Sequence, residues 1–458
     1  MRFSIKELLF FERDVRLRMP FRFGIVTLTQ APQAFVRARI AFADGKDAWG
    51  AAAELLAPKW FDKDPALSNE QNFDQLRAAL RIAREGYLAS GQNTAFGHWS
   101  SLYETQIEKC RGQNLNSLTA CFGPALIDRA VLDALCRALG VSFYDAIRRN
   151  LVSFAPAAAA ELLRSSGLPA SIAARHTVGL VDAITATDVK ERVNDGLPET
   201  LEEVVRHYGH RWFKLKVGGD VAADVERLSA IAAVLDRIPE PYRASLDGNE
   251  QFEDAASVLD LLQKVSGEKR LKRLSSSILF IEQPIKRQNA LASSVKALAK
   301  EKPVIIDESD DSLDAFPRAR RLGYTGVSSK TCKGLYKSLL NATRCKLWNR
   351  EEGAERYFMT GEDLTNQAGL ALQQDLALVS LLGLKHVERN GHHYVNGMAG
   401  LPEKEQEDFV SNHPDLYERS HGAVRLKIAK GTIATKSLDC PGFASRAMPD
   451  WNAMRSVH

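Results

Sequence analysis

The most constraining feature of this sequence is a series of short apolar runs that each end in charged side chains. The charged ends are Lys214, Lys216, Asp247, Glu282, Asp307 and Lys330. The steps along the chain from Lys216 are 31, 35, 25 and 23 residues, each long enough for one strand, one helix and two loops. Such runs are typical of buried parallel strands whose carboxyl ends open onto a site. We therefore predict that three lysines and three carboxylates meet at one end of a sheet.

The same alternation of strands and helices extends well beyond these runs. Eight strands are predicted, the first at Thr177 to Val181 and the last at His386 to Glu388. An unbroken alternation of this length favours a closed barrel over an open sheet. The predicted fold is therefore α/β, with a TIM-type (β/α)7β barrel at residues 166–400. Active sites in such barrels lie at the carboxyl ends of the strands.

The first part of the chain has mixed structure. Leu17 to Thr29 is predicted as a strand-loop-strand and Phe35 to Phe42 as a half-exposed strand, together forming a small antiparallel sheet. Phe73 to Tyr87 and Ala125 to Leu139 are predicted as helices. The intervening Trp60-Phe61 pair is predicted to be exposed in a loop. These elements predict an α+β capping domain.

We place the capping domain at residues 1–165 and a C-terminal segment that returns to it at residues 401–458. Ala157 to Ala160 form either a helix or a linker near the first boundary. In the C-terminal segment, Leu426 to Ile428 and Thr432 to Thr435 are predicted to pair as a short hairpin.

The composition excludes several classes of protein. The 61 basic and 57 acidic residues give a net charge of +4, which provides no electrostatic footprint for nucleic acid. The six cysteines show no C-x-x-C pair, so reduced, mostly buried thiols are expected. The N-terminus lacks a signal-peptide core and no stretch has membrane-spanning length. We expect a cytoplasmic protein without nucleic-acid or membrane partners.

Three of the charged ends suggest a metal site. Asp247, Glu282 and Asp307 offer hard oxygen ligands with no thiol or imidazole beside them, which suits Mg²⁺ rather than zinc. Each acid alone would be interpreted as a surface or salt-bridged carboxylate. Their occurrence at three successive strand ends argues against that interpretation for the set.

The lysines suggest acid/base chemistry. Lys214 and Lys216 are two positions apart on a strand, so their side chains point to the same face. Two ammonium groups this close should lower the pKa of at least one of them, which would make it a credible general base. Snorkelling surface lysines are the alternative, but the apolar neighbours of both residues indicate a buried strand. Lys330, four strands later, should lie across the barrel mouth from Lys216.

These motifs together resemble the enolase superfamily, above all the branch of muconate-lactonising enzymes, dipeptide epimerases and o-succinylbenzoate synthases. The matching motifs are K-x-K at Lys214, D-x-N at Asp247, E-Q-P at Glu282, D-E-S at Asp307 and the lysine at position 330. The resemblance implies a capped barrel, Mg²⁺ with Mn²⁺ as the alternative ion, and a homo-oligomer.

The resemblance also implies residue roles. Lys216 and Lys330 would act as acid and base on opposite faces of the substrate, and Lys214 would tune Lys216. Asp247, Glu282 and Asp307 would bind the metal. Two cap loops, near Phe21 to Gly24 and near Trp60, would face the substrate. The candidate substrate contacts are Phe21, Phe23, Trp60, Asn249, Glu308, Glu362 and Glu388.

The implied reaction removes a proton α to the carboxylate of a small substrate and forms an enediolate. Reprotonation would give racemisation or epimerisation, loss of a β group would give syn-elimination, and attack on an alkene would give cycloisomerisation. The motifs leave these three outcomes open.

Two other functions stay open at this point. One is a hydroxy- or sugar-acid dehydratase of the same superfamily, although the run Met359 to Asp363 lacks the histidine that such an enzyme would use. The other is a metabolite-binding barrel without turnover. His386, His392 and His393 are interpreted as solvated loop residues rather than as a second metal site.

Overall fold

Parallel strands close into a barrel in the computed structural model, which describes residues 1–155 and 168–457. Within these ranges, eight strands run in the order β12-β11-β10-β9-β8-β7-β6-β5, and β12 also pairs with β5. They are β5 (Ser171–Val178), β6 (Trp212–Lys216), β7 (Arg243–Asp247), β8 (Ile278–Glu282), β9 (Val304–Ile306), β10 (Gly326–Ser329), β11 (Phe358–Gly361) and β12 (His386–Arg389). The predicted α/β barrel is confirmed, although its first strand begins six residues earlier than predicted.

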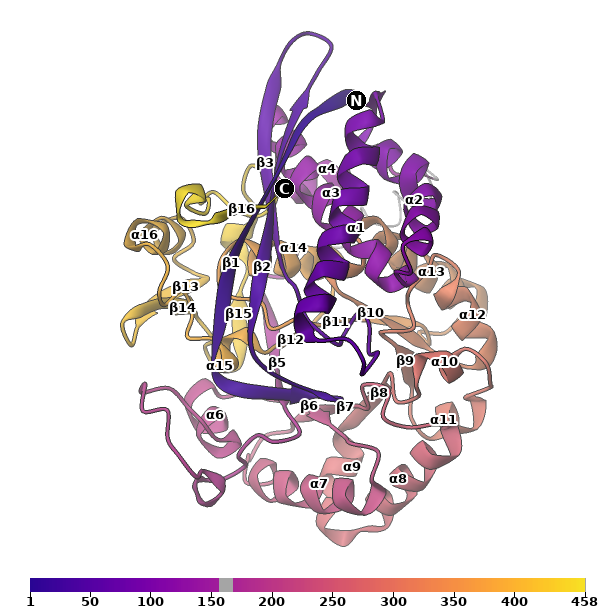
Figure 1. The fold of residues 1–458 in the computed structure, drawn as a ribbon. Helices are drawn as coiled ribbons and strands as arrows, with labels where there is room; N and C mark the ends of the chain where they lie inside the picture. Colours follow the sequence, from indigo (N-terminus) through magenta and orange to yellow (C-terminus); the bar gives the residue numbers. More distant parts are fainter. Residues whose placement is uncertain (156–167, 458) are drawn as a thin grey trace.

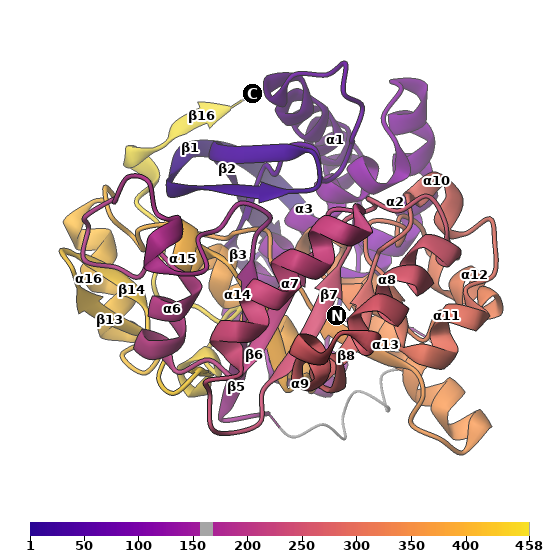
Figure 2. The same ribbon diagram turned by 90° about the horizontal axis from the view of Figure 1, so that it is seen from below.

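Helices cover the outside of the barrel, as Figures 1 and 2 show. They are α6 (Leu201–Tyr208), α7 (Val221–Leu235), α8 (Ala255–Gly267), α9 (Lys272–Ser277), α10 (Arg287–Ala290), α11 (Lys296–Glu301), α12 (Ala315–Leu322), α13 (Leu335–Glu352) and α14 (Leu370–Leu381). Local sequence fixes their ends. In α6, Thr200 and Glu203 form a capping box at the start, and Gly209, with a φ of 68°, ends the helix.

An antiparallel sheet and a group of helices form the cap at one side of the barrel (Figure 1). The sheet order is β16-β1-β2-β3, and the short β4 (Gln92–Asn93) also pairs with β1. Its main strands are β1 (Phe3–Phe23), β2 (Val26–Ala41), β3 (Asp47–Leu55) and β16 (Arg455–Val457), and its helices are α1 (Asn69–Ala89), α2 (Ala95–Gly112), α3 (Ser117–Leu139) and α4 (Phe143–Arg148). The predicted antiparallel sheet and both predicted helices are present.

The hairpin between β1 and β2 reaches the barrel with its tip. Gly24 takes a φ of 50° in the turn, a conformation that glycine adopts at little cost. Beside the turn, the Leu180 amide donates to the Arg22 carbonyl at 3.2 Å. Phe21 also stacks on Tyr394, with ring centroids 4.3 Å apart. The tip therefore contacts the barrel just beyond β5 and β12.

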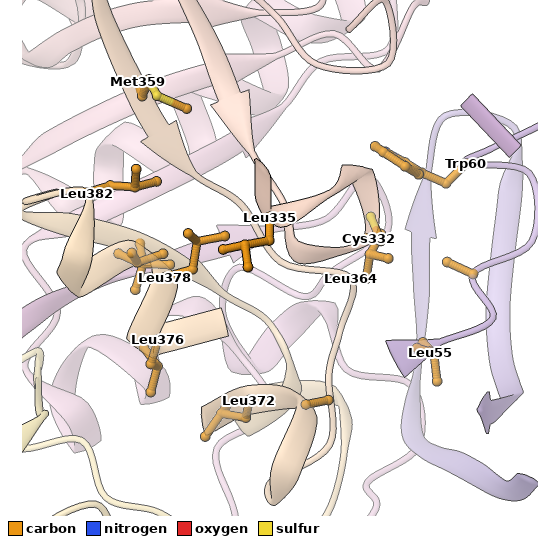
Figure 3. Close-up of a cluster of buried hydrophobic side chains, with 14 of the residues drawn as sticks. Leu55, Trp60, Cys332, Leu335, Met359, Leu364, Leu372, Leu376, Leu378 and Leu382 are labelled. Carbon is orange, nitrogen blue, oxygen red and sulfur yellow. The ribbon is translucent and has the colours of Figure 1, made fainter. Parts of the chain in front are cut away.

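A buried polar network joins the cap to the barrel beneath it. Glu54 of β3 accepts from Arg129 of α3 at 2.9 Å and from Thr331, just after β10, at 2.8 Å. Figure 3 places Leu55 and Trp60 on the cap ribbon and Leu335 on the barrel ribbon, within one cluster of buried hydrophobic side chains. Cap and barrel thus share a continuous core.

The C-terminal segment contacts both parts. It contains α16 (Glu403–Asn412), β13 (Tyr417–Ser420), β14 (Ala423–Leu426) and β15 (Thr432–Ala434), and it ends in β16. The predicted hairpin is wrong, because β14 pairs with β13 whereas β15 adds antiparallel to β5 of the barrel. Only one isolated bridge, between Ala429 and Thr432, lies within the predicted hairpin among the described residues. By contrast, β16 pairs with β1 in the cap.

Two further predictions concern the whole chain. All six cysteines are described, buried and outside any disulfide, as expected. No helix among the described residues combines the length and apolar character needed to cross a membrane. The run Ala157 to Ala160 and the predicted boundary at residue 165 lie outside the described residues, and the division at residues 165 and 400 stays a prediction.

Candidate active site

The charged residues singled out in the sequence lie at the carboxyl ends of neighbouring barrel strands. Lys216 of β6 is level with Asp247 of β7, which is level in turn with Glu282 of β8. Asp307 directly follows β9, and Lys330 directly follows β10. The structure brings these residues together because each parallel strand ends at the same edge of the barrel.

Lys214 lies at the centre of a buried cluster of carboxylates. Its Nζ is 2.8–3.0 Å from carboxylate oxygens of Asp247, Glu282, Glu362 and Glu388. Burial opposes the charge of this lysine, but the carboxylates outweigh burial and raise its pKa well above the ordinary value. Lys214 is therefore not a lysine with a lowered pKa, because the carboxylates act more strongly than the neighbouring ammonium.

Lys216 lies two residues beyond Lys214 on β6 and is closer to the barrel mouth. Its Nζ donates to Asp247 Oδ2 and to Asn249 Oδ1, both at 2.6 Å. Asn249 takes a φ of 40°, and its amide donates to Asp247 Oδ1 at 2.8 Å. The D-x-N motif thus fixes the lysine ammonium from two sides.

Lys330 has a separate carboxylate partner. Its Nζ donates to Asp307 Oδ2 at 2.6 Å and lies 4.2 Å from the centre of the Trp60 ring, a cation–π contact. Burial opposes the Lys330 charge, but Asp307 outweighs burial and raises the pKa of this lysine above its ordinary value. Asp307 therefore favours the ammonium form of Lys330.

The loop that carries Trp60 is tied to the barrel from below. Arg287 donates to the Phe61 carbonyl at 2.8 Å and to the Trp60 carbonyl at 2.9 Å, and it also pairs with Glu250. Lys63 donates to the Asn249 carbonyl at 2.7 Å. The predicted exposure of Trp60 and Phe61 is wrong: each is only 2% exposed, because the barrel binds their loop.

A pocket lies between cap and barrel at this point. The cap contributes Phe21, Phe23 and Trp60, and the barrel contributes Lys216, Asn249, Lys330 and Glu388 among others. Seven predicted site residues therefore line one pocket. The two lysines enter it from β6 and from the end of β10, on separate strands of the barrel.

Two predicted substrate contacts, Glu308 and Glu362, do not line this cavity. Glu308 accepts from Asn249 Nδ2 at 3.1 Å, and Glu362 contacts Lys214 and Arg175. Both side chains are fully buried. They are placed to hold lining residues and the lysine cluster rather than to contact a molecule in the cavity.

The donor set at the strand ends has the oxygen chemistry that a hard divalent cation prefers, although the Lys214 ammonium lies between Asp247 and Glu282 in this structure. Burial, followed by repulsion from Glu362, raises the pKa of Glu282 well above its ordinary value, and Asp247 and Asp307 add to this effect. Glu282 Oε2 is buried and accepts no hydrogen bond of good geometry, although it lies 2.8 Å from Lys214 Nζ. Buried carboxylate oxygens are hard ligands of the kind that Mg²⁺ prefers.

The histidines after the eighth strand are not solvated, contrary to prediction. His392 and His393 lie in α15 (Gly391–Tyr394) and are 9% and 3% exposed. His386 stacks on Trp212, with ring centroids 4.3 Å apart. His392 and His393 pack against His176 of β5, and His392 also packs against Tyr208 at the end of α6. The local sequence does not reveal these partners.

Several residues at the site were missed from the sequence. Lys333 lies 3.4 Å from Asp307 Oδ1 and donates to the Ser328 carbonyl at 2.8 Å. Asp363, Thr365 and Asn390 line the cavity. Lys333 is three residues after Lys330, and this short spacing could have indicated that both lysines lie near Asp307. Asp363 follows Glu362 directly after β11, and Asn390 follows Arg389 at the end of β12, so these lining residues also come after charged strand ends.

Comparison with known proteins agrees with this geometry. The family model of enolase C-terminal domain-like proteins matches residues 196–348, the segment that carries every candidate lysine and metal ligand. The predicted resemblance to the enolase superfamily is confirmed. Among curated proteins, none has a sequence that matches this chain.

Solved structures of this superfamily share the whole architecture. The muconate lactonizing enzyme of Pseudomonas fluorescens, in complex with muconolactone, has 19% identity and a TM-score of 0.61, with 98% of this chain and 97% of that chain covered. The 2-chloromuconate cycloisomerase of Rhodococcus opacus 1CP has 16% identity and a TM-score of 0.60, with 98% of each chain covered. An enolase-superfamily member of Roseovarius nubinhibens ISM, in complex with magnesium, has 17% identity and a TM-score of 0.56, with 100% and 99% covered. At these identities the likeness shows the fold.

Proposed function

We propose that this protein is a divalent-metal-dependent enzyme that removes a proton α to the carboxylate of a small substrate. The observation that carries the proposal is the shared cavity of Lys216 and Lys330. Each ammonium is held at 2.6 Å by its own carboxylate, Asp247 or Asp307, at a different strand end. Two separately held lysines beside one bound carbon could transfer protons on its two faces.

The lysines and the aromatic residues of the cap would have different roles in the reaction. Lys216 is the candidate base on one face of the substrate, and Lys330 is the candidate acid or base on the other. The neutral form of Lys216 would keep its position through hydrogen bonds with Asn249. The aromatic rings of Phe21, Phe23 and Trp60 would exclude water from the reacting carbon. Lys214 would act indirectly, because it is not among the residues that line the cavity.

Asp247, Glu282 and Asp307 would hold Mg²⁺, with Mn²⁺ as the alternative ion. When bound, the ion would supply positive charge opposite the carboxylate oxygens of the substrate as negative charge develops there. Isothermal titration calorimetry with Mg²⁺ tests this assignment. We expect binding that Glu282→Gln weakens and that Glu253→Gln, an exposed control, leaves unchanged. Absence of binding at millimolar Mg²⁺ would favour a barrel without turnover.

Solvent exchange tests the two lysines directly. We would screen small carboxylates in D₂O by NMR for deuterium incorporation at the α-carbon. Lys216→Ala and Lys330→Ala should each reduce exchange by roughly 10²–10⁴-fold, the usual contribution of a general acid or base. Lys286→Ala, which removes a partly exposed lysine outside the cavity, is the matched control. Unchanged exchange in both site variants would contradict the proposal.

The reaction that follows proton removal has three forms within this proposal: racemisation or epimerisation, cycloisomerisation, and syn-elimination. Product analysis of the substrates found in the exchange screen distinguishes them. The dehydratase alternative has less support, because none of the described residues that line the cavity is a histidine. Muconolactone, the ligand of one similar structure, gives a first carboxylate to test.

We also propose a homo-oligomer in the cytoplasm, which the resemblance and the composition suggested. Light scattering on the purified full chain measures the oligomeric state. A monomer at all concentrations tested would contradict this part of the proposal and would leave the acid/base chemistry unaffected.

A further inference from the structure

A second group of titratable side chains lies on the outer face of the barrel. Arg175 and Thr177 of β5 point inward, because they contact Glu362 and Glu388. His176, between them, must point to the opposite face. There it meets two histidines from other elements: His210, in the loop between α6 and β6, and His392 of α15.

The three imidazoles form a compact triangle. Ring centroids are 5.3 Å apart for His176 and His210, 5.5 Å for His176 and His392, and 5.4 Å for His210 and His392. One ring nitrogen from each residue lies within 4.8 Å of the other two. Zinc held tetrahedrally at about 2.0–2.1 Å would bring such nitrogens to about 3.4 Å, a change within reach of small ring rotations.

Four of the ring nitrogens of this triangle lack a hydrogen-bond partner among the described residues. His176 Nδ1, His210 Nε2 and both nitrogens of His392 are buried and make no hydrogen bond. Buried polar atoms are costly unless they are paired, so each calls for an explanation. His210 also has the arrangement usual for a metal ligand, because its Nδ1 donates to the Ala174 carbonyl at 3.1 Å and leaves the lone pair on Nε2.

Burial also keeps these imidazoles neutral. It lowers the pKa of His210 to about 4 and, together with the neighbouring histidines, places the pKa values of His176 and His392 well below the ordinary range. Neutral imidazole is the form that binds a metal ion, so proton competition at neutral pH is small.

We propose that His176, His210 and His392 form a binding site for a divalent transition-metal ion, with zinc the best match. Imidazole ligands suit zinc, and three of them leave a fourth position for water. His392 also lines a pocket that shares no lining residue with the cavity between Lys216 and Lys330, so the two candidate sites are separate.

The position of the site suggests its role. Strands β5 and β12 are the first and last of the barrel, and their pairing closes it. His176 belongs to β5, and His392 lies in the short helix directly after β12. An ion bound by both histidines would stabilise the pairing of β5 with β12. The site does not depend on the acid/base function proposed above, and it can be tested without any substrate.

The test uses the full chain, stripped of metal and held in saturating Mg²⁺ so that the carboxylate site is occupied. Titration with Co²⁺ should give visible absorption bands of a tetrahedral ion at one equivalent, and Zn²⁺ should displace it. Zinc should also raise the thermal midpoint in proportion to the logarithm of its concentration. Failure of both ions to bind under these conditions would overturn the proposal.

Two variants and one control locate the ion. His210→Gln and His392→Gln should each weaken Co²⁺ binding by more than the roughly 10–100-fold that loss of an outer-shell partner costs. His421→Gln, outside the triangle, should bind as the unaltered chain does. Circular dichroism verifies that each variant is folded. Co²⁺ binding measured in one folded variant is sufficient to test the site. Unweakened binding in a folded variant would overturn the proposal.

Discussion

Lys214 shows how one residue can balance the charge of a whole site. Burial alone would raise the pKa values of its neighbours Asp247 and Glu388, but the Lys214 ammonium is the strongest charge opposing burial, and the pKa values of both carboxyls are lowered. Removing a member of such a set leaves uncompensated charge in a medium that solvates it poorly. The lysine is therefore a structural requirement of the strand ends as well as a neighbour of the candidate base.

Lys214→Met should lower the free energy of unfolding by roughly 3–5 kcal/mol, the range for loss of one partner from a buried ion pair. Urea unfolding followed by circular dichroism in a chelating buffer measures the change. The control is Lys286→Met at a partly exposed lysine, where a change within about 0.5 kcal/mol is expected. Equal effects of the two substitutions would show that the carboxylates do not need this charge.

At the scale of elements, the cap sheet is held against its helices by close backbone approach. A Cβ at Gly50 of β3 would lie 2.1 Å from the Ala134 amide nitrogen and 2.3 Å from the Ala130 carbonyl oxygen of α3. Backbone atoms cannot rotate away as side-chain atoms do. The spacing between β3 and α3 therefore depends on this glycine.

Gly50→Ala should destabilise the protein by about 1–3 kcal/mol, because the added methyl group overpacks the contact. Gly112→Ala is the matched control, since a Cβ there meets nothing within 4 Å. At a helix position alanine is favoured over glycine, so the control should be neutral or stabilising. Thermal unfolding of both variants makes the comparison, and a neutral Gly50→Ala would contradict the packing argument.

The loop that carries Trp60 is a second element whose position depends on a distant residue. Arg287→Ala should free this loop, since each charge-assisted hydrogen bond to it contributes about 1.5–3 kcal/mol. Hydrogen–deuterium exchange measured by mass spectrometry should become faster in the peptide around residues 58–64. Arg270→Ala, at an exposed arginine paired with Glu226, should leave that peptide unchanged. Slow exchange in Arg287→Ala would show that other contacts suffice.

At the scale of the whole molecule, single side chains join segments from distant parts of the chain. Asp133 of α3 accepts from the Ala51 amide of β3 at 2.8 Å and from the Phe443 amide of the C-terminal segment at 2.6 Å. It also pairs with Arg137 at 2.9 Å. One buried carboxylate thus connects three parts of the structure.

Asp133→Asn keeps the size of the side chain but removes its charge and one acceptor oxygen. We expect a loss of about 1.5–3 kcal/mol in the free energy of unfolding, the usual contribution of a hydrogen bond to a charged group. Urea unfolding measures it, and Asp74→Asn on the exposed face of α1 provides the comparison. If the two variants unfolded alike, the connection through Asp133 would contribute little.

Features that depend on neighbouring residues in the sequence could be predicted, and features that depend on residues far along the chain could not. The strand ends at Asp247 and Glu282 could be predicted because an apolar run and its terminal charge are local features. The fold then followed from repetition of that pattern. The roles of the lysines came from the resemblance, and they remain to be tested by exchange.

Features that depend on distant partners could not be predicted. Trp60 is buried by Arg287 and Lys330, which lie more than 200 residues further along the chain. The histidine triangle forms only because β5 and β12 meet when the barrel closes. In both cases an aromatic or imidazole side chain stands beside polar residues in the sequence. An exposed loop would have the same local pattern.

The pairing of β1 with β16 sets an order for folding. Phe10 lies opposite Val457, so almost the full length of the described chain must be arranged before this edge of the cap sheet is covered. Contacts between such distant residues form late, because a long loop must close first. Until then β1 presents an uncovered edge on which a strand of another molecule could add. Refolding at high protein concentration should therefore lose material to aggregation at a stage when the barrel itself is already built.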